Sequence, residues 1–453
     1  MATSSQSKQL ESVLGSSPAS VPPLSSPRPK VGAAPDFRIV EIDVLRGIAL
    51  IGIYWINVVI FAFPHGAYSL PILIGDAKTA NVTVWAFSDV FVEGTMRGLF
   101  SLLFGASTLI FLDEAKLEFR DGLRVVDRYY RRCLTLMMFG LLHAYVLLAK
   151  WDLLYAYGLL GMFLFPLRNL SARTLIVLGL LLFIISDFNT WSETQEALKG
   201  YEELRGKTSQ QIAEYRDESH QGDVGEMELE LVTYLSGYSD IFRAQAAAVA
   251  EQQSSSMYAD HIFDIGGMML LGMALMKLGI LTGKRSIRFY TGLALAGYGL
   301  GGSLRGIETY ELWLADFVSE TRNPSLFMPY NIGRIAMTLG HVGLIGALMK
   351  VGWMTGAASY LSPVGRLALT NYVGQTLFSV FFFYGVGLGF FGYFERYQLI
   401  WVFLAVVVFQ IIASRVWLRR FRVGPLEWLW RSMIYGSPQP LLRVSASQIV
   451  PAP

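Results

Sequence analysis

The chain has 453 residues, of which 53% are hydrophobic and 16% are charged, against about 25% charged residues in an average soluble domain. Its mean hydropathy is +0.42, and a soluble protein of this size cannot bury so much apolar surface in one core. The net charge of +2 lacks the basic excess that nucleic-acid binding needs. The single cysteine, Cys133, excludes an intrachain disulfide and a cysteine-based zinc site. We therefore expect an all-α polytopic membrane protein whose main partner is the bilayer, without nucleic acid and without a metal site.

Long apolar runs predict about ten transmembrane helices, because a helix needs about 20 apolar residues to cross the hydrocarbon core. The runs lie at 45–63, 88–111, 132–149, 153–168, 172–189, 260–281, 287–304, 329–351, 365–386 and 398–418. Basic residues gather in alternate connections: Lys116, Arg120, Arg124, Arg128, Arg131 and Arg132; Arg168 and Arg173; Lys284, Arg285 and Arg288; Arg415, Arg419, Arg420 and Arg422. Cytoplasmic loops carry this excess of Lys and Arg, so the alternation predicts that both termini are cytoplasmic.

Composition divides the chain further. We expect a disordered Ser/Pro-rich tail at 1–36, five helices at 37–189, an extracytoplasmic helical loop at 190–258, five helices at 259–437, and a disordered tail at 438–453. The loop is polar and acidic and favours two or three amphipathic helices. A lid, a contact in a homodimer and a passive spacer all stay open as its role.

Ionisable residues inside the apolar runs carry the functional signal, because each costs roughly 2.5–3.5 kcal/mol on insertion scales. Asp43 and Arg46 lie at the inner end of the first run, three residues apart. Glu93 and Arg97, four residues apart in the second run, can pair on one helical face. The plainer interpretation of both pairs is structural, as a capping or a buried ion pair.

Two histidines are candidates for a catalytic base. His143 lies in the third run, and Asp152 at the start of the fourth run can turn back towards it. His65 follows the first run in the outer loop. A histidine with a carboxylate partner suits general-base catalysis on a hydroxyl or amine, and the same pair can relay protons in a transporter. A neutral imidazole bonded to a neighbouring helix is the structural alternative for His143.

Other polar residues complete the candidate site. Asn57 lies near the outer end of the first run, Arg334 and His341 lie in the eighth, and Asn371 lies in the ninth. By depth, several of these side chains fall in the outer third of the membrane. We therefore predict a polar cavity open to the outside, with a second polar feature at the cytoplasmic mouth around Asp43 and Arg46.

Several motifs resemble a known family. The runs RIVEIDVLRGIALIGIYWINVVIFAFP, EGTMRGLFSLLFGAS, HAYVLLAKWDLLYAYGLLG, GRLALTNYVGQT and FRVGPLEWLWRSMIYG resemble the YeiB-like family of bacterial inner-membrane proteins, a domain of unknown function, over about 38–437. This resemblance implies a multi-pass protein of the bacterial inner membrane.

The DxxRG pattern of Asp43, Arg46 and Gly47, followed by Asn57, is also similar to membrane acyltransferases of the heparan-α-glucosaminide N-acetyltransferase type. That resemblance implies an acyl-CoA co-substrate in the cytoplasm, an acceptor on the far side, and a catalytic histidine at the position of His65. His143, in a better family match, is our preferred base.

Three functions from different classes remain open: an acyltransferase, a transporter, and a scaffold in envelope biogenesis that binds its partner through 190–258. In a transmembrane O- or N-acyltransferase, His143 or His65 would deprotonate a glycan, lipid or small-molecule acceptor, oriented by Glu93 or Asp152. Arg46 and Arg97 would attract donor phosphates or stabilise the acyl oxyanion, with no cofactor bound beyond acyl-CoA as co-substrate. The alternative is a transporter or exporter of a small solute or envelope precursor, in which the intramembrane Glu, Arg and His residues serve proton coupling. The candidate residues for binding substrate or co-substrate are Asp43, Arg46, Asn57, Arg97, Arg334, His341 and Asn371.

Overall fold

The structure is a computed structural model that describes residues 39–71, 79–118, 122–189, 191–254, 262–318, 321 and 330–443. The tail predicted at 1–36 lies outside these residues. The described chain is helical and forms no strand, apart from one isolated bridge between Phe421 and Leu442, which confirms the all-α class. Its elements are α2 (Val40–Ala62), α3 (His65–Ser69), α4 (Thr79–Phe91), α5 (Thr95–Glu118), α6 (Gly122–Leu141), η1 (Leu142–Val146), α7 (Leu154–Leu167), α8 (Ala172–Asn189), α9 (Trp191–Arg205), α10 (Ser209–Tyr234), α11 (Tyr238–Glu251), α12 (Ile262–Lys277), α13 (Ile287–Leu314), α14 (Tyr330–Lys350), α15 (Thr355–Arg366), α16 (Ala368–Phe383), η5 (Arg396–Gln398), α17 (Leu399–Arg420) and α18 (Pro425–Tyr435).

The ten apolar runs are largely helical, although the second is divided between α4 and α5 and the third between α6 and η1. The length and composition of five segments suffice to cross a membrane. These segments are Val40–Ala62, Thr79–Ala115, Ala172–Asn189, Tyr330–Lys350 and Arg396–Arg420. The other runs form helices that are shorter, such as α12 and α16 with 16 residues each, or richer in charge, such as α6 and α13. The chain is thus a helical membrane protein, and the count of ten spans stays a prediction.

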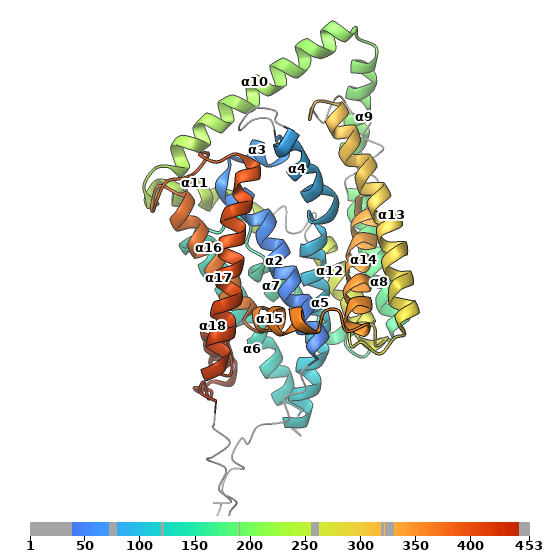
Figure 1. Ribbon diagram of the computed structural model, residues 1–453, viewed down its shortest axis with the longest axis vertical. Coiled ribbons are helices and arrows are strands. Elements are labelled where there is room, and N and C mark those ends of the chain that lie inside the picture. Colours follow the sequence, from blue (N-terminus) through green and yellow to red (C-terminus); the bar gives the residue numbers. More distant parts are fainter. Residues whose placement is uncertain are drawn as a thin grey trace, which may run out of the picture. The chain divides into compact units, whose positions relative to one another are not determined.

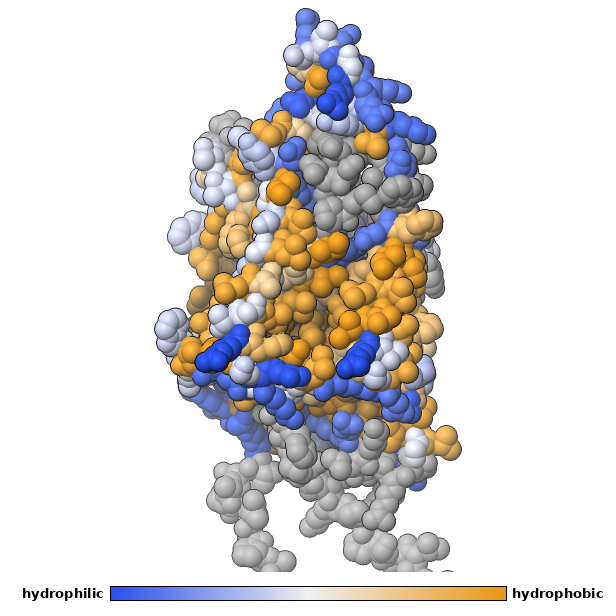
Figure 2. All heavy atoms as spheres, turned by 90° about the vertical axis from the view of Figure 1, so that its right-hand side faces the viewer, coloured by the Kyte–Doolittle hydropathy of each residue, from blue (hydrophilic) through white to orange (hydrophobic). Residues whose placement is uncertain are grey.

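The surface agrees with a membrane environment. Figure 2 shows a broad hydrophobic band between two hydrophilic rims, on the side where α13 lies in Figure 1. Along α13, Leu295 is 71% exposed, and Leu300 and Ile307 are each more than half exposed. Such a continuous apolar surface is too large for a soluble monomer and suits contact with lipid chains.

Helix α2 organises the interior. It packs against α5, α15, α16 and α17 (Figure 1) and contributes residues to three apolar clusters, through Leu50, Tyr54 and Val44 among others. Close approach depends on glycines: a Cβ atom on Gly365 would lie 2.0 Å from the carbonyl oxygen of Asp43. Small residues let backbones meet in this way in membrane helix pairs.

Two local irregularities shape the candidate site. The second apolar run is not one helix, because Gly94 adopts a left-handed backbone (φ +65°) between α4 and α5, a conformation that glycine takes without steric cost. The third run changes from α6 into the π-helix η1, which contains His143 and is followed by Leu148 with φ +56°.

The polar segment predicted as an extracytoplasmic loop contains three helices, α9, α10 and α11. Thr208 and Gln211 form a capping box that starts α10. Helix α10 contacts α3 and α11, and α11 contacts η1 (Figure 1), so the segment lies against the end of the bundle near α3.

The sequence assigns 438–453 to a disordered tail, and the described residues of that segment, 438–443, correct this expectation. Residues 438–443 are held in place, since the backbone N–H of Arg422 donates to Leu441 and that of Arg443 donates to Arg420. The Trp428 indole N–H donates to the carbonyl of Gln439. The short sequence PQPLLR of 438–443 gives no sign of these long-range bonds, and 444–453 lies outside the described residues.

Candidate functional site

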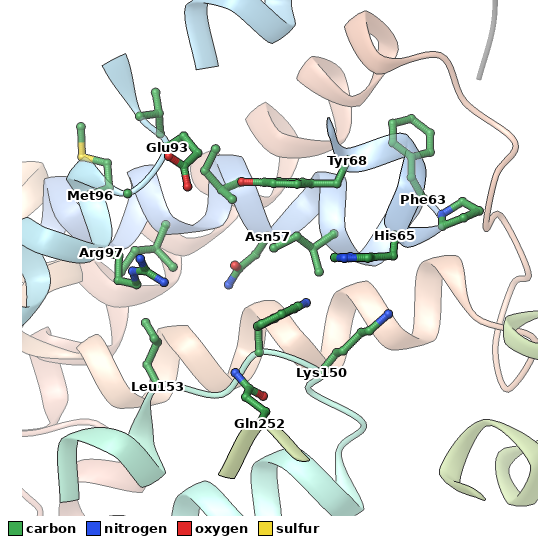
Figure 3. A pocket seen from close by; sticks show the side chains of 17 residues that line it. Asn57, Phe63, His65, Tyr68, Glu93, Met96, Arg97, Lys150, Leu153 and Gln252 are labelled. Carbon is green, nitrogen blue, oxygen red and sulfur yellow. The ribbon is translucent and has the colours of Figure 1, made fainter. Parts of the chain in front are cut away.

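A cavity of about 300 Å³ lies beside the C-terminal half of α2. Its walls come from α2, α3, the turn before α5, the start of α5, residues 150–153 and the segment after α11 (Figure 3). Apolar side chains form much of the lining, and the polar ones are Asn57, His65, Tyr68, Glu93, Arg97, Lys150 and Gln252. An apolar cavity with a few convergent polar groups is the usual form of a small-molecule site.

His65 stands at one side of this cavity. Helix α2 ends at Ala62, and the extended residues Phe63 and Pro64 lead into α3, which His65 begins. The backbone N–H of His65 donates to Glu230 Oε2 at 2.6 Å, and its ring stacks on the Trp151 indole at a centroid distance of 6.1 Å. Contacts from α10 and from residue 151 thus fix the position of this imidazole.

The surroundings of His65 favour its neutral form. Burial lowers the pKa of the imidazole below its usual value, and the ammonium group of Lys150 lowers this pKa further. The carboxylates of Glu230 and Glu226 oppose the shift but do not reverse it. A neutral imidazole at the wall of a cavity is able to accept a proton from a bound molecule.

Glu93 lies across the cavity from His65, in the turn that Gly94 makes before α5 (Figure 3). Its Oε2 atom accepts a hydrogen bond from Tyr330 at 3.0 Å and lies 3.3 Å from Nη2 of Arg305. Arg305 is 2% exposed and also contacts Asp89 and Glu308. The carboxylate of Glu93 is therefore held by α13 and α14.

Arg97 does not form the ion pair with Glu93 that the sequence spacing predicts, because the break at Gly94 removes the continuous helix on which that pairing depends. Its Nη2 atom lies 2.9 Å from Asp264 Oδ2 instead. The other carboxylate oxygen of Asp264 binds Arg334. Arg97 thus faces the cavity while a buried carboxylate on α12 holds it.

Arg334 lies behind Arg97, outside the cavity lining. Its residue exposure is 0%, and its Nη2 atom donates to Asn331 Oδ1 at 2.8 Å. Asn331 in turn donates to Asp187 at 2.5 Å. The resulting chain of charged and polar groups links α5, α8, α12 and α14 behind the cavity wall.

His143 and Asp152 meet, as the sequence predicts, but away from the cavity lining. His143 Nδ1 lies 2.7 Å from Asp152 Oδ1, and its Nε2 lies 2.8 Å from the hydroxyl of Thr376. Asp152 Oδ2 accepts from the backbone N–H of Tyr155 at 2.8 Å. Both ring nitrogens of the buried His143 are thus engaged by protein groups, an arrangement that joins η1, α7 and α16.

Asp43 and Arg46 lie in the first two turns of α2, far along the helix from Asn57. Arg46 Nη2 donates to the hydroxyl of Ser107 at 2.7 Å, and its Nη1 lies 3.4 Å from Asp43. The side chain of Arg46 keeps 24% exposure. Asn57 is 11 positions after Arg46 on the same helix, so with a rise of about 1.5 Å per residue the two lie about 16 Å apart along the axis.

His341 and Asn371 also lie outside the cavity lining. His341 bonds Tyr298 at 2.7 Å through Nδ1 and the carbonyl of Phe91 at 3.0 Å through Nε2. Asn371 donates to Ser414 at 3.0 Å and to the carbonyl of Val364 at 3.2 Å. Both make the helix-to-helix hydrogen bonds that such residues commonly form in membrane proteins.

The cavity also contains residues that the sequence did not single out. Tyr68 points its hydroxyl towards Glu93 (Figure 3). Gln252, just after α11, lines the cavity, and Glu230 on α10 lies 3.7 Å from Lys150. The polar composition of the segment from α9 to α11 resembles any solvated surface, so its sequence carries no sign of this role. Among the described residues, no cluster of three His, Cys, Asp or Glu side chains could hold a metal ion.

Comparison with known proteins identifies the family to which the chain belongs. The family model described as "Protein of unknown function (DUF418)" matches residues 275–437. The chain is 30% identical to "Uncharacterized protein YeiB" of Escherichia coli (strain K12), over 87% of this chain and 96% of that protein. It is 27% identical to "Uncharacterized protein YxaH" of Bacillus subtilis (strain 168), over 90% of this chain and 96% of that protein. No solved structure matches the chain.

Proposed function

The chain belongs to the YeiB-like family, whose matching model is described only as a protein of unknown function, and we propose from its cavity that it is an integral-membrane acyltransferase. The observation that carries the proposal is a histidine whose neutral form is favoured at the wall of a largely apolar cavity, with a guanidinium on the opposite side. These are the two groups that acyl transfer needs, a base and a stabiliser of the oxyanion.

We assign the base to His65 in preference to His143. Both nitrogens of the buried His143 are bonded to Asp152 and Thr376, and His143 does not line the cavity, so neither nitrogen faces a molecule bound there. The His65 ring lies at the cavity and its nearest described neighbours fix it through its backbone and its face. His143 and Asp152 are then a structural pair that supports the segment carrying Lys150 and Leu153.

In the proposed reaction, His65 accepts the proton of an acceptor hydroxyl or amine, and the acceptor atom attacks the thioester carbonyl of the donor. Arg97 stabilises the negative charge that develops on the carbonyl oxygen. The carbon–sulfur bond then breaks, and the thiol leaves with the proton from His65. Asp264 keeps Arg97 in place during these steps.

We propose acyl-CoA as the donor, because the DxxRG pattern of this chain resembles that of acyltransferases that use acyl-CoA. Arg46, at the other end of α2, would attract the phosphates of this donor. The acceptor would be a glycan, lipid or small molecule at the far face. The basic connections and the bacterial relatives support a bacterial inner-membrane location with both termini cytoplasmic.

Calorimetric titration of acetyl-CoA and longer acyl-CoAs into the protein in nanodiscs tests the donor. We expect binding in the wild type that weakens in Arg46→Ala. Arg131→Ala is the matched control, because Arg131 carries the same charge but is half exposed and pairs only with Asp127 among the described residues. Equal weakening in both variants would indicate general charge attraction, and no binding of any acyl-CoA would contradict the proposal.

A transporter is the second candidate, favoured by one observation. The groups Asp187, Asn331, Arg334, Asp264 and Arg97 form a continuous polar chain that ends at the cavity, and intramembrane ionisable residues serve proton coupling. Solute uptake by proteoliposomes under a proton gradient, without any acyl donor, would support this candidate over acyl transfer.

A further inference from the structure

A second cavity of about 520 Å³ lies between α16 and α17. We call it the α16–α17 slot, and it is framed by Phe378, Phe409 and Trp417. Phe409 is 70% exposed, and only 33% of the apolar span of α17 is buried. The slot therefore opens on the face that α17 presents to its surroundings, which for this apolar helix is lipid.

Small residues give the slot its depth and length. A Cβ atom on Gly374 would meet no atom within 4 Å, so α16 leaves open space there. On α17, Ala405 and Ala413 line the slot two turns apart, with Trp417 one turn further. The twelve residues from Ala405 to Trp417 correspond to about 18 Å of helix, close to the roughly 15 Å thickness of one hydrocarbon leaflet.

The polar side chains along the slot are bonded to one another. Asn371 donates to Ser414 at 3.0 Å, and Gln410 donates to the backbone carbonyl of Asn371 at 2.9 Å. Gln375 in turn donates to Oε1 of Gln410 at 3.0 Å. Because Asn371, Gln410 and Ser414, which line the slot, are bonded between the helices, the slot offers mainly apolar surface to an occupant.

The slot ends where positive charge gathers. Trp417 and Pro425 lie at that end, and α17 finishes with the exposed residues Arg419 and Arg420, followed by Arg422. The carboxylate of the nearby Glu427 is turned inward and accepts bonds from Thr370. Arginine side chains at a membrane surface attract and bind phosphate headgroups.

We propose that the α16–α17 slot binds one acyl chain of an anionic phospholipid, with its headgroup phosphate at the Arg419–Arg422 end. Length, direction and apolar lining match a chain lying along the membrane normal, and the charge at one end selects the headgroup. The proposal is independent of the acyltransferase proposal, because the slot and the cavity around His65 share no lining residue.

Photo-cross-linking tests the proposal. The full chain is placed in nanodiscs of zwitterionic lipid containing a trace of anionic phospholipid with a diazirine in its acyl chain, and labelled residues are mapped by mass spectrometry. We expect labelling at Phe378 and Phe409 severalfold above that at Leu295 and Leu300 of α13, which are also lipid-exposed. The same chain on a zwitterionic headgroup should label the slot severalfold less.

Variants that fill the slot, with one control outside it, test whether the labelling depends on the slot. Ala413→Phe and Gly374→Val both fill the slot and should remove the excess labelling, whereas Val408→Phe, on the exposed α17 surface outside the slot, should not. Each variant is first checked for an unchanged elution volume in size exclusion.

Equal labelling of slot and α13 positions in the wild type would mean ordinary surrounding lipid only and would overturn the proposal, without needing any variant. Equal labelling of the slot by the anionic and the zwitterionic lipid probe would contradict the proposed selection of an anionic headgroup. A slot protected from every lipid probe, with Ala413→Phe changing the oligomeric state, would assign it to a second copy of the chain instead.

Discussion

Replacement of Asp264 by asparagine is expected to destabilise the protein strongly. Asp264 lies between two arginines, 2.9 Å from Arg97 Nη2 and bonded to Arg334 through its other oxygen. Arg334 is fully buried, and its Nε and Nη1 atoms have no hydrogen-bond partner among the described residues. Breaking a buried ion pair by removing one partner costs about 3–5 kcal/mol, because a charge stays buried without compensation.

An exposed pair of the same length provides the control. Asp127 Oδ1 also lies 2.9 Å from an arginine, Nε of Arg131, but the two side chains are 52% and 50% exposed. Solvent screens such a pair, so Asp127→Asn should cost only about 0–1 kcal/mol. The predicted gap between the two variants, about 3 kcal/mol, comes from burial alone.

Unfolding in mixed detergent micelles, followed by helical circular dichroism as the denaturing detergent increases, measures both free energies of unfolding. Adding Arg334→Met to Asp264→Asn should recover part of the loss, because it removes one uncompensated charge. A loss in Asp264→Asn no larger than that in Asp127→Asn would refute the reasoning, because burial would then carry no penalty.

Three further predictions concern other parts of the chain. Gly105→Ala should destabilise by about 1–3 kcal/mol, since its Cβ would lie 1.9 Å from the carbonyl oxygen of Met269, while Gly292→Ala, which meets nothing within 4 Å, should be neutral or slightly stabilising in the same unfolding assay. His143→Ala should lower the free energy of unfolding by about 1–3 kcal/mol, because Asp152 and Thr376 lose a buried hydrogen-bond partner. Equal stability of variant and wild type would contradict a stabilising role of these two bonds. In NMR titrations of the histidines, Lys150→Gln should raise the pKa of His65 and Glu230→Gln should lower it, and shifts in one common direction would argue against this electrostatic account. Because the folded-state pKa of His65 is lowered, its stabilising contribution should be present above the unfolded value of about 6.5 and lost as the pH falls through the folded-state pKa.

Local patterns allowed the sequence to predict the helices and the nearby contacts. The apolar runs are largely helical, and His143 and Asp152, nine residues apart, meet as expected. The pair of Glu93 and Arg97 fails because one glycine, Gly94, turns the chain between two helices. A spacing rule assumes a continuous helix, and a glycine does not by itself reveal that the helix stops.

The sequence alone could not predict contacts between segments that are far apart along the chain. His65 is fixed by Glu230, 165 residues further along the chain, and the partner of Arg97 comes from α12. Depth along single helices predicts a polar site near the outer end of the bundle, but it could not separate residues that line the cavity, such as Glu93, from those, such as Arg334, that lie outside its lining. That distinction depends on how helices rotate about their axes when they pack.

Turnover of radiolabelled acetyl-CoA by membrane vesicles containing the protein tests the acyltransferase proposal most directly. We predict that label passes from acetyl-CoA to an envelope acceptor in the wild type and in His220→Ala, whose histidine on α10 contacts Asp316 outside the cavity. His65→Ala should lower the rate by about 10²–10⁴-fold, the usual contribution of a general base. Equal rates in His65→Ala and the wild type, or no transfer from acetyl-CoA and longer acyl-CoAs, would contradict it.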